Sequence, residues 1–297
     1  MSTRVMFIGA HQDDMQGAAA GAFAQLRESL DYDGLEVSLT NGIVGHHGPK
    51  YLRDPARLTA LRVKEATEAA RVVGFDYRLL NDWRGNEFPD ADLQITRESK
   101  GAVWAAVRDF QPDLLVTLPI NDIRDSFGMH NDHTNVGEIV KRIAYLIPAP
   151  YAFREYYSEA DIEALAAVDE PPYVAPPLIV TTHDCYSEQI DPDIVLDVTA
   201  QADAKAEAFA KHVSQAQEWL PWIGRYKAPQ SKAELRKGME QRSRKLAAKL
   251  GLPSGIYEAF TLTSWAKTPT LDDVKRFFPN DAFDHRRARD KIRSLSS

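Results

Sequence analysis

Two clusters of histidine and carboxylate residues, far apart in the sequence, could together bind a metal ion. The first cluster, AHQDD, spans residues 10–14 and directly follows the apolar run 5–9. The second, HNDH, spans residues 130–133 and comes shortly after the apolar run 114–118. Each run is typical of a buried strand in a parallel sheet, and sites in open α/β folds form outside the carboxyl ends of such strands. The pair of clusters therefore suggests a hydrolytic metal site at one edge of a sheet.

The spacing within each cluster suggests what its residues could do. A sharp turn can direct both His11 and Asp14 at one ion, and either His130 or His133 could complete a set of three ligands. Three nitrogen and oxygen ligands with a fourth position open to water describe a catalytic zinc site. Asp13 could then act as the base, while the remaining histidine stabilises an oxyanion. Each cluster alone fits polar loop residues and helix capping better than a metal site, so the metal hypothesis depends on the two clusters meeting.

The elements that would position these clusters follow an alternating order. Strands are predicted near 4–9, 36–40, 76–80 and 113–118, and helices near 15–29, 55–73, 97–110 and 132–146. Beyond a proline-rich stretch, we predict strands at 178–182 and near 194–196, and helices near 158–167, 201–218 and 232–250. This order predicts an α/β fold with a Rossmann-like, mostly parallel sheet flanked by helices.

Composition limits the class of protein. The 297 residues have a formal net charge of −7, which gives no support to broad nucleic-acid binding. The single cysteine, Cys185, excludes an internal disulfide, and no apolar segment approaches the ~20 residues of a membrane span. With no signal peptide evident at its start, the chain is expected to be cytoplasmic.

The charge is unevenly distributed along the chain. Residues 226–297 hold 16 Lys and Arg against 8 Asp and Glu, so this tail is basic while residues 1–225 are acidic. We predict a main domain at 1–225 and a basic helical C-terminal extension at 226–297, packed on that domain or on a neighbouring subunit. A homo-oligomer is one expectation from this pattern, and a solvated pair of helices is the alternative.

The motifs resemble those of a known family. Residues 7–14 are similar to the Ala-His-Pro-Asp-Asp-Glu signature of the PIG-L/LmbE family of zinc-dependent N-deacetylases, and residues 130–133 resemble its His-Pro-Asp-His element. Weaker matches follow in the family's order at Thr40-Asn41-Gly42, at Arg62-Val63-Lys64-Glu65-Ala66, and at Asp197-Val198-Thr199 with Lys205 and His212-Val213-Ser214-Gln215. The resemblance covers about residues 4–217.

The resemblance implies a role for each matching residue. His11, Asp14 and His133 would bind Zn²⁺ or another divalent metal, Asp13 would be the general base, and His130 would stabilise the tetrahedral intermediate. Three further residues would contact substrate or support the site: Arg62, Asp132 and His212. The implied substrate is a small N-acetylated molecule, such as an amino sugar or a related glycoconjugate.

The first motif departs from the family pattern at two places. Gln12 replaces the usual proline, and Met15, followed by Gln16, occupies the position of the usual glutamate. None of these positions carries a proposed ligand or the base, so we expect effects on turn geometry and substrate preference rather than on the reaction type.

Two other functions compete with the deacetylase hypothesis. A nucleotide-binding Rossmann protein would fit the fold pattern, but no G-x-G-x-x-G follows the first strand, and Asp13 and Asp14 would repel a pyrophosphate. A non-catalytic, metal-binding family member is the other alternative. Outside the motifs, His46 and His47 are expected to be an exposed loop pair rather than pocket residues, and Trp219 and Trp222 packing anchors rather than a sugar platform.

Overall fold

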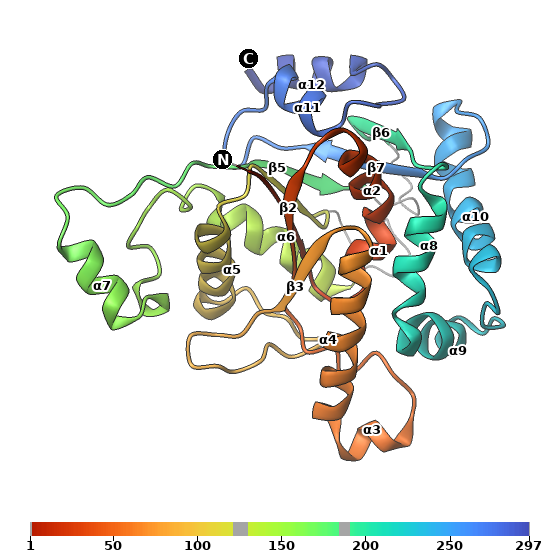
Figure 1. The fold of residues 1–297 in the computed structure, drawn as a ribbon, viewed down its shortest axis with the longest axis horizontal. Coiled ribbons are helices and arrows are strands. Elements are labelled where there is room, and N and C mark those ends of the chain that lie inside the picture. Colours follow the sequence, from red (N-terminus) through yellow and green to blue (C-terminus); the bar gives the residue numbers. More distant parts are fainter. Residues whose placement is uncertain (1, 121–129, 184–190, 297) are drawn as a thin grey trace.

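A mixed, mostly parallel sheet forms the centre of the molecule (Figure 1). The computed structural model describes residues 2–120, 130–183 and 191–296, so Cys185 lies outside the described residues. The sheet has seven strands in the order β3-β2-β1-β4-β5-β7-β6. The strands are β1 (Thr3–Gly9), β2 (Tyr32–Ser38), β3 (Phe75–Leu79), β4 (Leu114–Thr117), β5 (Leu178–Thr182), β6 (Ile194–Asp197) and β7 (Tyr257–Leu262). The predicted fold class is confirmed.

The two strands that precede the histidine clusters are neighbours. β1 pairs in parallel with β4, with Phe7 opposite Val116 and Ile8 opposite Thr117. Both strands are buried along their shared length, as expected of apolar runs covered on both faces. Because the two strands are parallel and in register, their carboxyl ends meet at one edge of the sheet, and the first cluster begins there.

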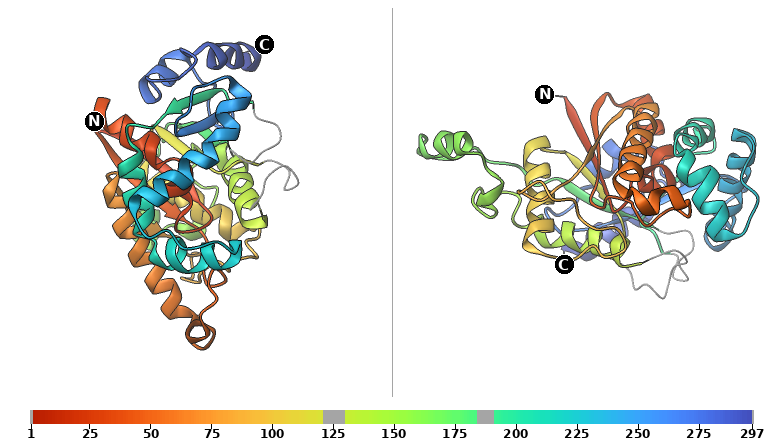
Figure 2. Two further views of the ribbon diagram at one scale, coloured as in Figure 1. Left: turned by 90° about the vertical axis from the view of Figure 1, so that its right-hand side faces the viewer. Right: turned by 90° about the horizontal axis from the view of Figure 1, so that it is seen from below.

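Helices cover both faces of the sheet (Figure 2). α5 (Arg97–Phe110) and α6 (Asn131–Ala144) pack together on one side, and α4 (Pro55–Val72) packs with α8 (Ala202–Ala210) on the other. α8 also contacts α2 (Ala20–Ser29) and α10 (Lys232–Leu250). The shorter helices are α1 (Asp14–Ala18), α3 (Pro49–Arg53), α7 (Glu159–Ala166), α9 (Leu220–Gly224), α11 (Leu271–Phe277), α12 (Arg286–Ser296), and the 3₁₀ turn η2 (Arg154–Tyr156). No helix among the described residues is long and apolar enough to cross a membrane.

Two predicted helices are interrupted. The helix predicted near 15–29 breaks at Ala19 into α1 and α2. The carboxylate of Glu258 accepts hydrogen bonds from the first-turn amides of α2, at 3.1 Å from Gly21 N and 2.6 Å from Ala22 N, and so satisfies donors that the break leaves free. The helix predicted near 201–218 ends at residue 210 and resumes as η3 (Ser214–Trp219), a wider turn of π-helix.

The C-terminal tail contributes a strand as well as helices. The predicted α10 is present, but β7 was not predicted, and it lies antiparallel between β5 and β6. Basic side chains of α10 meet acidic side chains of α8, with Lys232 Nζ 3.0 Å from Glu207 and Arg236 Nη1 3.1 Å from Asp203. A domain boundary at residue 225 stays a prediction, and it would divide one hydrogen-bonded sheet.

Candidate metal and catalytic site

The two clusters meet at the carboxyl ends of β1 and β4. His11 Nδ1 lies 3.0 Å from His133 Nε2, and Asp14 Oδ1 lies 3.3 Å from His133 Nε2 and 3.8 Å from His11 Nδ1. Ligands bound to zinc at about 2.0–2.1 Å in a tetrahedron are separated by roughly 3.3 Å. These three atoms therefore have the mutual spacing that a tetrahedral metal site requires. They could bind one ion without rearrangement of the chain.

His130 stands at the same place as the predicted ligands. Its ring centroid is 4.4 Å from that of His133 and 5.1 Å from that of His11, and the three histidines lie close enough to hold a metal ion together. Burial and the neighbouring His133 and His11 lower the pKa of His130, which favours a ring without positive charge. The His130 side chain is 43% exposed, so it borders space that a substrate can enter.

Asp14 is oriented by the start of α1. Its Oδ2 accepts hydrogen bonds from Ala10 N at 2.7 Å and His11 N at 2.8 Å, which leaves Oδ1 directed at the histidines. Burial alone would raise the pKa of Asp14, but the charge of His133 and hydrogen bonds from both histidines lower it well below its usual range. An ionised carboxylate at this position is the form that ligates a metal.

His11 is held from behind by two carboxylates. Its Nε2 lies 3.1 Å from Asp90 Oδ1 and 3.3 Å from Asp132 Oδ2. Burial opposes a charged ring, yet hydrogen bonds with Asp132, Asp14 and Asp90 raise the pKa of His11 well above its usual value. Because Nδ1 faces Asp14 and His133, Nε2 is the nitrogen that donates to these carboxylates. Such support is typical of metal-binding histidines.

Asp90 was not identified in the sequence. It lies in the long loop between β3 and α5, far from both clusters in sequence and without a motif of its own. Its Oδ2 accepts a hydrogen bond from Val44 N at 2.8 Å, so it joins His11 to the loop after β2. Asp132, which was predicted, accepts from Ala91 N and Leu93 N in the same loop as Asp90. Only the folded arrangement of this loop places the second carboxylate.

Arg62 reaches Asp13 from the middle of α4. Its Nη2 donates to Asp13 Oδ1 at 2.9 Å, and its Nη1 donates to the Gly42 carbonyl at 3.0 Å. The Arg62 residue is only 2% exposed, so this ion pair is shielded from water on the arginine side. One oxygen of Asp13 is therefore fixed, while the side chain keeps 16% of its surface accessible.

His212 is close enough for the charges of Arg62 and Asp13 to act on its ring. It is fully buried, and neither ring nitrogen has a hydrogen-bond partner among the described residues. Burial lowers the pKa of His212 to about 4, an effect that Arg62 reinforces and the charges of Asp13 and Asp14 oppose. The ring is thus uncharged at neutral pH, and among the described residues no hydrogen bond joins it to the candidate metal ligands.

The departures from the family signature are all buried. Gln12 Nε2 donates to the Thr40 carbonyl at 2.8 Å, which joins the turn after β1 to the end of β2. Gln16 Nε2 donates to Glu36 Oε2 at 2.9 Å, whereas Met15 packs in the hydrophobic core. The two hydrogen bonds lead to β2 and the residues after it, and neither involves the three clustered donor atoms.

Known structures share this fold. N,N'-diacetylchitobiose deacetylase from Pyrococcus horikoshii matches with a TM-score of 0.64 and 20% identity, over 91% of this chain and 88% of that one. GalB, the 4-carboxy-2-hydroxymuconate hydratase from Pseudomonas putida KT2440, matches with a TM-score of 0.60 and 18% identity, over 87% and 95%. The zinc inhibited form of teicoplanin deacetylase Orf2 matches with a TM-score of 0.52 and 14% identity, over 87% and 97%. At these identities the likeness establishes the fold alone.

The sequence itself also matches a family. No curated protein sequence matches the chain. The family model described as PIG-L: GlcNAc-PI de-N-acetylase matches residues 6–144, a segment that contains both histidine clusters, Arg62 and Asp90. This match to residues 6–144 is the family resemblance that the paired motifs predicted.

Proposed function

We propose that this protein is a metal-dependent N-deacetylase that removes the acetyl group from an N-acetylated amino sugar or a related glycoconjugate. The observation that carries the proposal is the spacing of His11 Nδ1, His133 Nε2 and Asp14 Oδ1, with the carboxylate of Asp13 adjacent in the chain. The PIG-L family match and the deacetylases among the structural neighbours support this reaction.

His11, Asp14 and His133 would hold the metal, for which Zn²⁺ is our proposal. Two imidazole nitrogens and one carboxylate oxygen are a donor set that zinc accepts in catalytic sites. When bound, the ion would polarise the amide carbonyl and lower the pKa of a coordinated water to about 7. Asp90 and Asp132 would fix the His11 ring through its Nε2 proton.

Asp13 is proposed to move the proton in both halves of the reaction. Arg62 holds Oδ1, which leaves Oδ2 to accept a proton from the attacking water and to return one to the departing amine. The Arg62 ion pair keeps this carboxylate in one orientation, so the base is already in position before the substrate binds.

His130 is proposed to donate a hydrogen bond to the oxygen that becomes negative as water attacks the carbonyl. Its partial exposure places it at the accessible side of the cluster, and an uncharged imidazole still carries one N–H donor. His130 Nδ1 lies 3.8 Å from Asp132 Oδ2, beyond hydrogen-bonding distance, so this contact does not require the single ring proton. With that proton on Nε2, Nε2 would be the nitrogen that donates to the oxyanion.

The proposal is tested by metal content and acetate release measured on one sample. Asp13→Asn keeps an oxygen that can accept from Arg62 but removes the base, so turnover should fall by about 10²–10⁴-fold while about one divalent ion per chain is retained. Deacetylation of N-acetylglucosamine derivatives is followed by mass spectrometry, with excess zinc avoided because one neighbour is described in a zinc inhibited form.

Three outcomes would contradict this function. Undiminished turnover in Asp13→Asn would remove the assigned base. Bound metal without amine release from any N-acetyl substrate would favour a non-catalytic protein, or a different reaction such as the hydration named for GalB. Tight binding of NAD or another nucleotide without deacetylation would favour the nucleotide-binding alternative.

A further inference from the structure

Part of the segment between α6 and β5 projects from the molecule as an arm. Residues 158–173 contain α7, and Figures 1 and 2 show this helix standing apart from the sheet and from the helices that cover it. None of the residues 158–173 is buried. We call residues 158–173 the arm.

The base of the arm is anchored on α5. The buried Phe153 ring lies 5.5 Å from the ring of Trp104, measured between centroids. Tyr156 Oη donates a hydrogen bond to the Glu98 carbonyl at 2.6 Å. The arm therefore leaves the molecule from a fixed point, directly after these contacts.

α7 lacks the packing that a helix of eight residues needs. Isolated helices shorter than about 12–15 residues are marginal in water, and no residue of α7 is buried. The capping box of Ser158 and Asp161 satisfies amides at its start but covers no apolar surface. Ile162 and Leu165 lie three residues apart on one side of the helix and are half-buried, and Val168 follows at 48% exposure. This apolar stripe is what a docking surface would cover.

The arm is also strongly acidic. It contains no lysine or arginine, and no basic side chain among the described residues pairs with its carboxylates. The five acidic residues are Glu159, Asp161, Glu163, Asp169 and Glu170. The arm therefore presents uncompensated negative charge beside its apolar stripe.

A basic surface lies at the other end of the molecule. α10 has seven Lys and Arg against two Glu. Lys232 and Arg236 pair with α8, whereas the exposed Lys237 and Arg244 have no ion-pair partner in the parts of the chain that the structure describes. These two residues are seven apart and so share one face of the helix. Figures 1 and 2 place α7 and α10 at opposite ends, so an arm cannot reach α10 of its own chain.

Exposed apolar side chains adjoin this basic face. Ile223 on α9 and Tyr226 just after it are 53% and 50% exposed. Burial raises the pKa of Tyr226, and the charge of Arg242 on α10 opposes that rise, so the two side chains are neighbours. We call Lys237, Arg242, Arg244, Ile223 and Tyr226 the basic patch.

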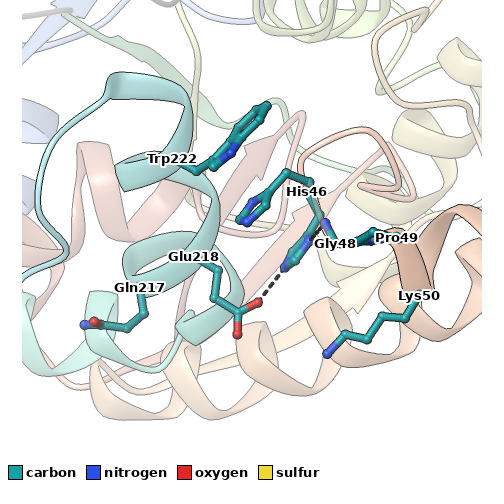
Figure 3. A pocket seen from close by; sticks show the side chains of 8 residues that line it. His46, Gly48, Pro49, Lys50, Gln217, Glu218 and Trp222 are labelled. Carbon is teal, nitrogen blue, oxygen red and sulfur yellow. Dashed lines mark hydrogen bonds and ion pairs between the residues drawn. The ribbon is translucent and has the colours of Figure 1, made fainter.

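Contacts on its inner side hold α9 in place. The Trp222 ring is parallel to the His47 ring within 5° at 4.8 Å between centroids, and His46 Nε2 lies 2.6 Å from Glu218 Oε2 (Figure 3). The His46 side chain is only 3% exposed, which contradicts the expectation that His46 and His47 form an exposed loop pair. The apolar part of the basic patch is thus presented by a segment that is already fixed.

We propose that the arm of one chain docks on the basic patch of a second copy of the same chain. The two surfaces are complementary in both respects, since each combines apolar side chains with one sign of charge. Each chain can give one arm and receive one, which closes either as a reciprocal dimer or as a ring. A net charge of −7 disfavours nucleic acid as the occupant of the patch. The inference does not depend on the proposed deacetylase function.

The test measures the mass of the full-length protein in solution by size-exclusion chromatography with light scattering. At about 50 μM the wild type should contain two or more chains. Reversing charge on the arm, with Glu163→Lys and Glu170→Lys, should weaken association by at least about tenfold. Reversing it on the patch, with Lys237→Glu and Arg244→Glu, should do the same.

Two rescue experiments separate docking from damage to the fold. A chain that carries all four substitutions exchanges the charges of the two surfaces, so its association should recover. A mixture of the arm variant and the patch variant keeps one intact arm and one intact patch, so it should form a complex of one chain of each. Glu68→Lys, which reverses an exposed charge on α4, is the control and should leave the mass unchanged.

Three results would overturn the proposal. The first is a monomeric wild type, whether or not polylysine binds the arm or DNA binds the patch. The second is unchanged association in the arm and patch variants. The third is a loss of association in both variants that neither rescue restores while melting temperatures stay at the wild-type value. Acetate release is measured separately, so failure of the deacetylase proposal would leave this result standing.

Discussion

Replacing Asp90 with asparagine tests whether the carboxylates behind His11 support metal binding. In the structure, Asp90 Oδ1 is 3.1 Å from His11 Nε2, and Oδ2 accepts from Val44 N at 2.8 Å. In Asp90→Asn, the amide oxygen is needed by the Val44 N–H, so the NH₂ group would face the Nε2 proton. Two donors would then oppose each other, and His11 would lose the orientation in which Nδ1 points at Asp14 and His133.

The size of the effect follows from how many partners remain. Loss of such a supporting group typically lowers metal affinity by about 10–100-fold. Asp132 remains 3.3 Å from the same nitrogen, so the single variant should fall near the lower limit, about tenfold or ~1.4 kcal/mol. Combining Asp90→Asn with Asp132→Asn should weaken binding by more than the product of the single effects, because each carboxylate can replace the other.

The assay is a competition titration of Zn²⁺ against a chelating dye, with melting temperature recorded for each variant. Asp92→Asn is the matched control, since Asp92 lies in the same loop but is exposed and bonds only to Gln94 among the described residues. A folded Asp90→Asn protein with wild-type metal affinity would refute the reasoning. An equal loss in Asp92→Asn would show that net charge, rather than the contact with His11, is responsible.

Three further perturbations probe the structure around the site. Burial raises the pKa of Glu36 well above its usual value, so wild-type stability should fall as the pH rises from about 4.5 toward that raised pKa. Melting temperatures measured across this pH range should lose the slope in Glu36→Gln. The control Asp33→Asn, at an exposed position on the same strand, should keep it. Glu258→Ala should lower the free energy of unfolding by about 3–5 kcal/mol in denaturant titration, because it leaves the buried Lys205 without its carboxylate partner. A decrease below ~1 kcal/mol would contradict a structural role for the pair. Gly42→Ala should lower the melting temperature and slow turnover. Gly42 has φ +70°, and a Cβ there would lie 2.4 Å from the Gln12 side chain. An unchanged melting temperature and turnover would show that the loop adapts.

Local signals account for the parts of the fold that the sequence predicts well. α4 begins where expected because Asp54 accepts a hydrogen bond from Arg57 N and Pro55 occupies the first turn. β1 and β4 are continuous apolar runs, so their existence and their central position follow from burial alone. The meeting of the two histidine clusters then follows from parallel pairing of these strands.

The missed features depend on partners that are distant in sequence. β7 contains Glu258, which interrupts any apolar pattern, and its burial is acceptable only because Lys205 and the amides at the start of α2 surround that carboxylate. Asp90 is placed by the path of the long loop between β3 and α5. In each case tertiary contacts decide the position, and no short-range pattern reports them.

The unusual residues of the first motif are explained by the layer beneath the site. A glutamate at position 15 would be buried among apolar side chains, where Met15 packs without penalty. At position 16 an amide suits Glu36, because a second carboxylate there would add to the acidic charges of Asp13 and Asp14 that already act on Glu36. Gln12 binds the Thr40 carbonyl, two residues before Gly42, whose carbonyl Arg62 holds. Gln12 and Gln16 therefore act on the β2 side of the turn, so we expect them to shape the loop after β2 and to leave the donor atoms facing His133 in place.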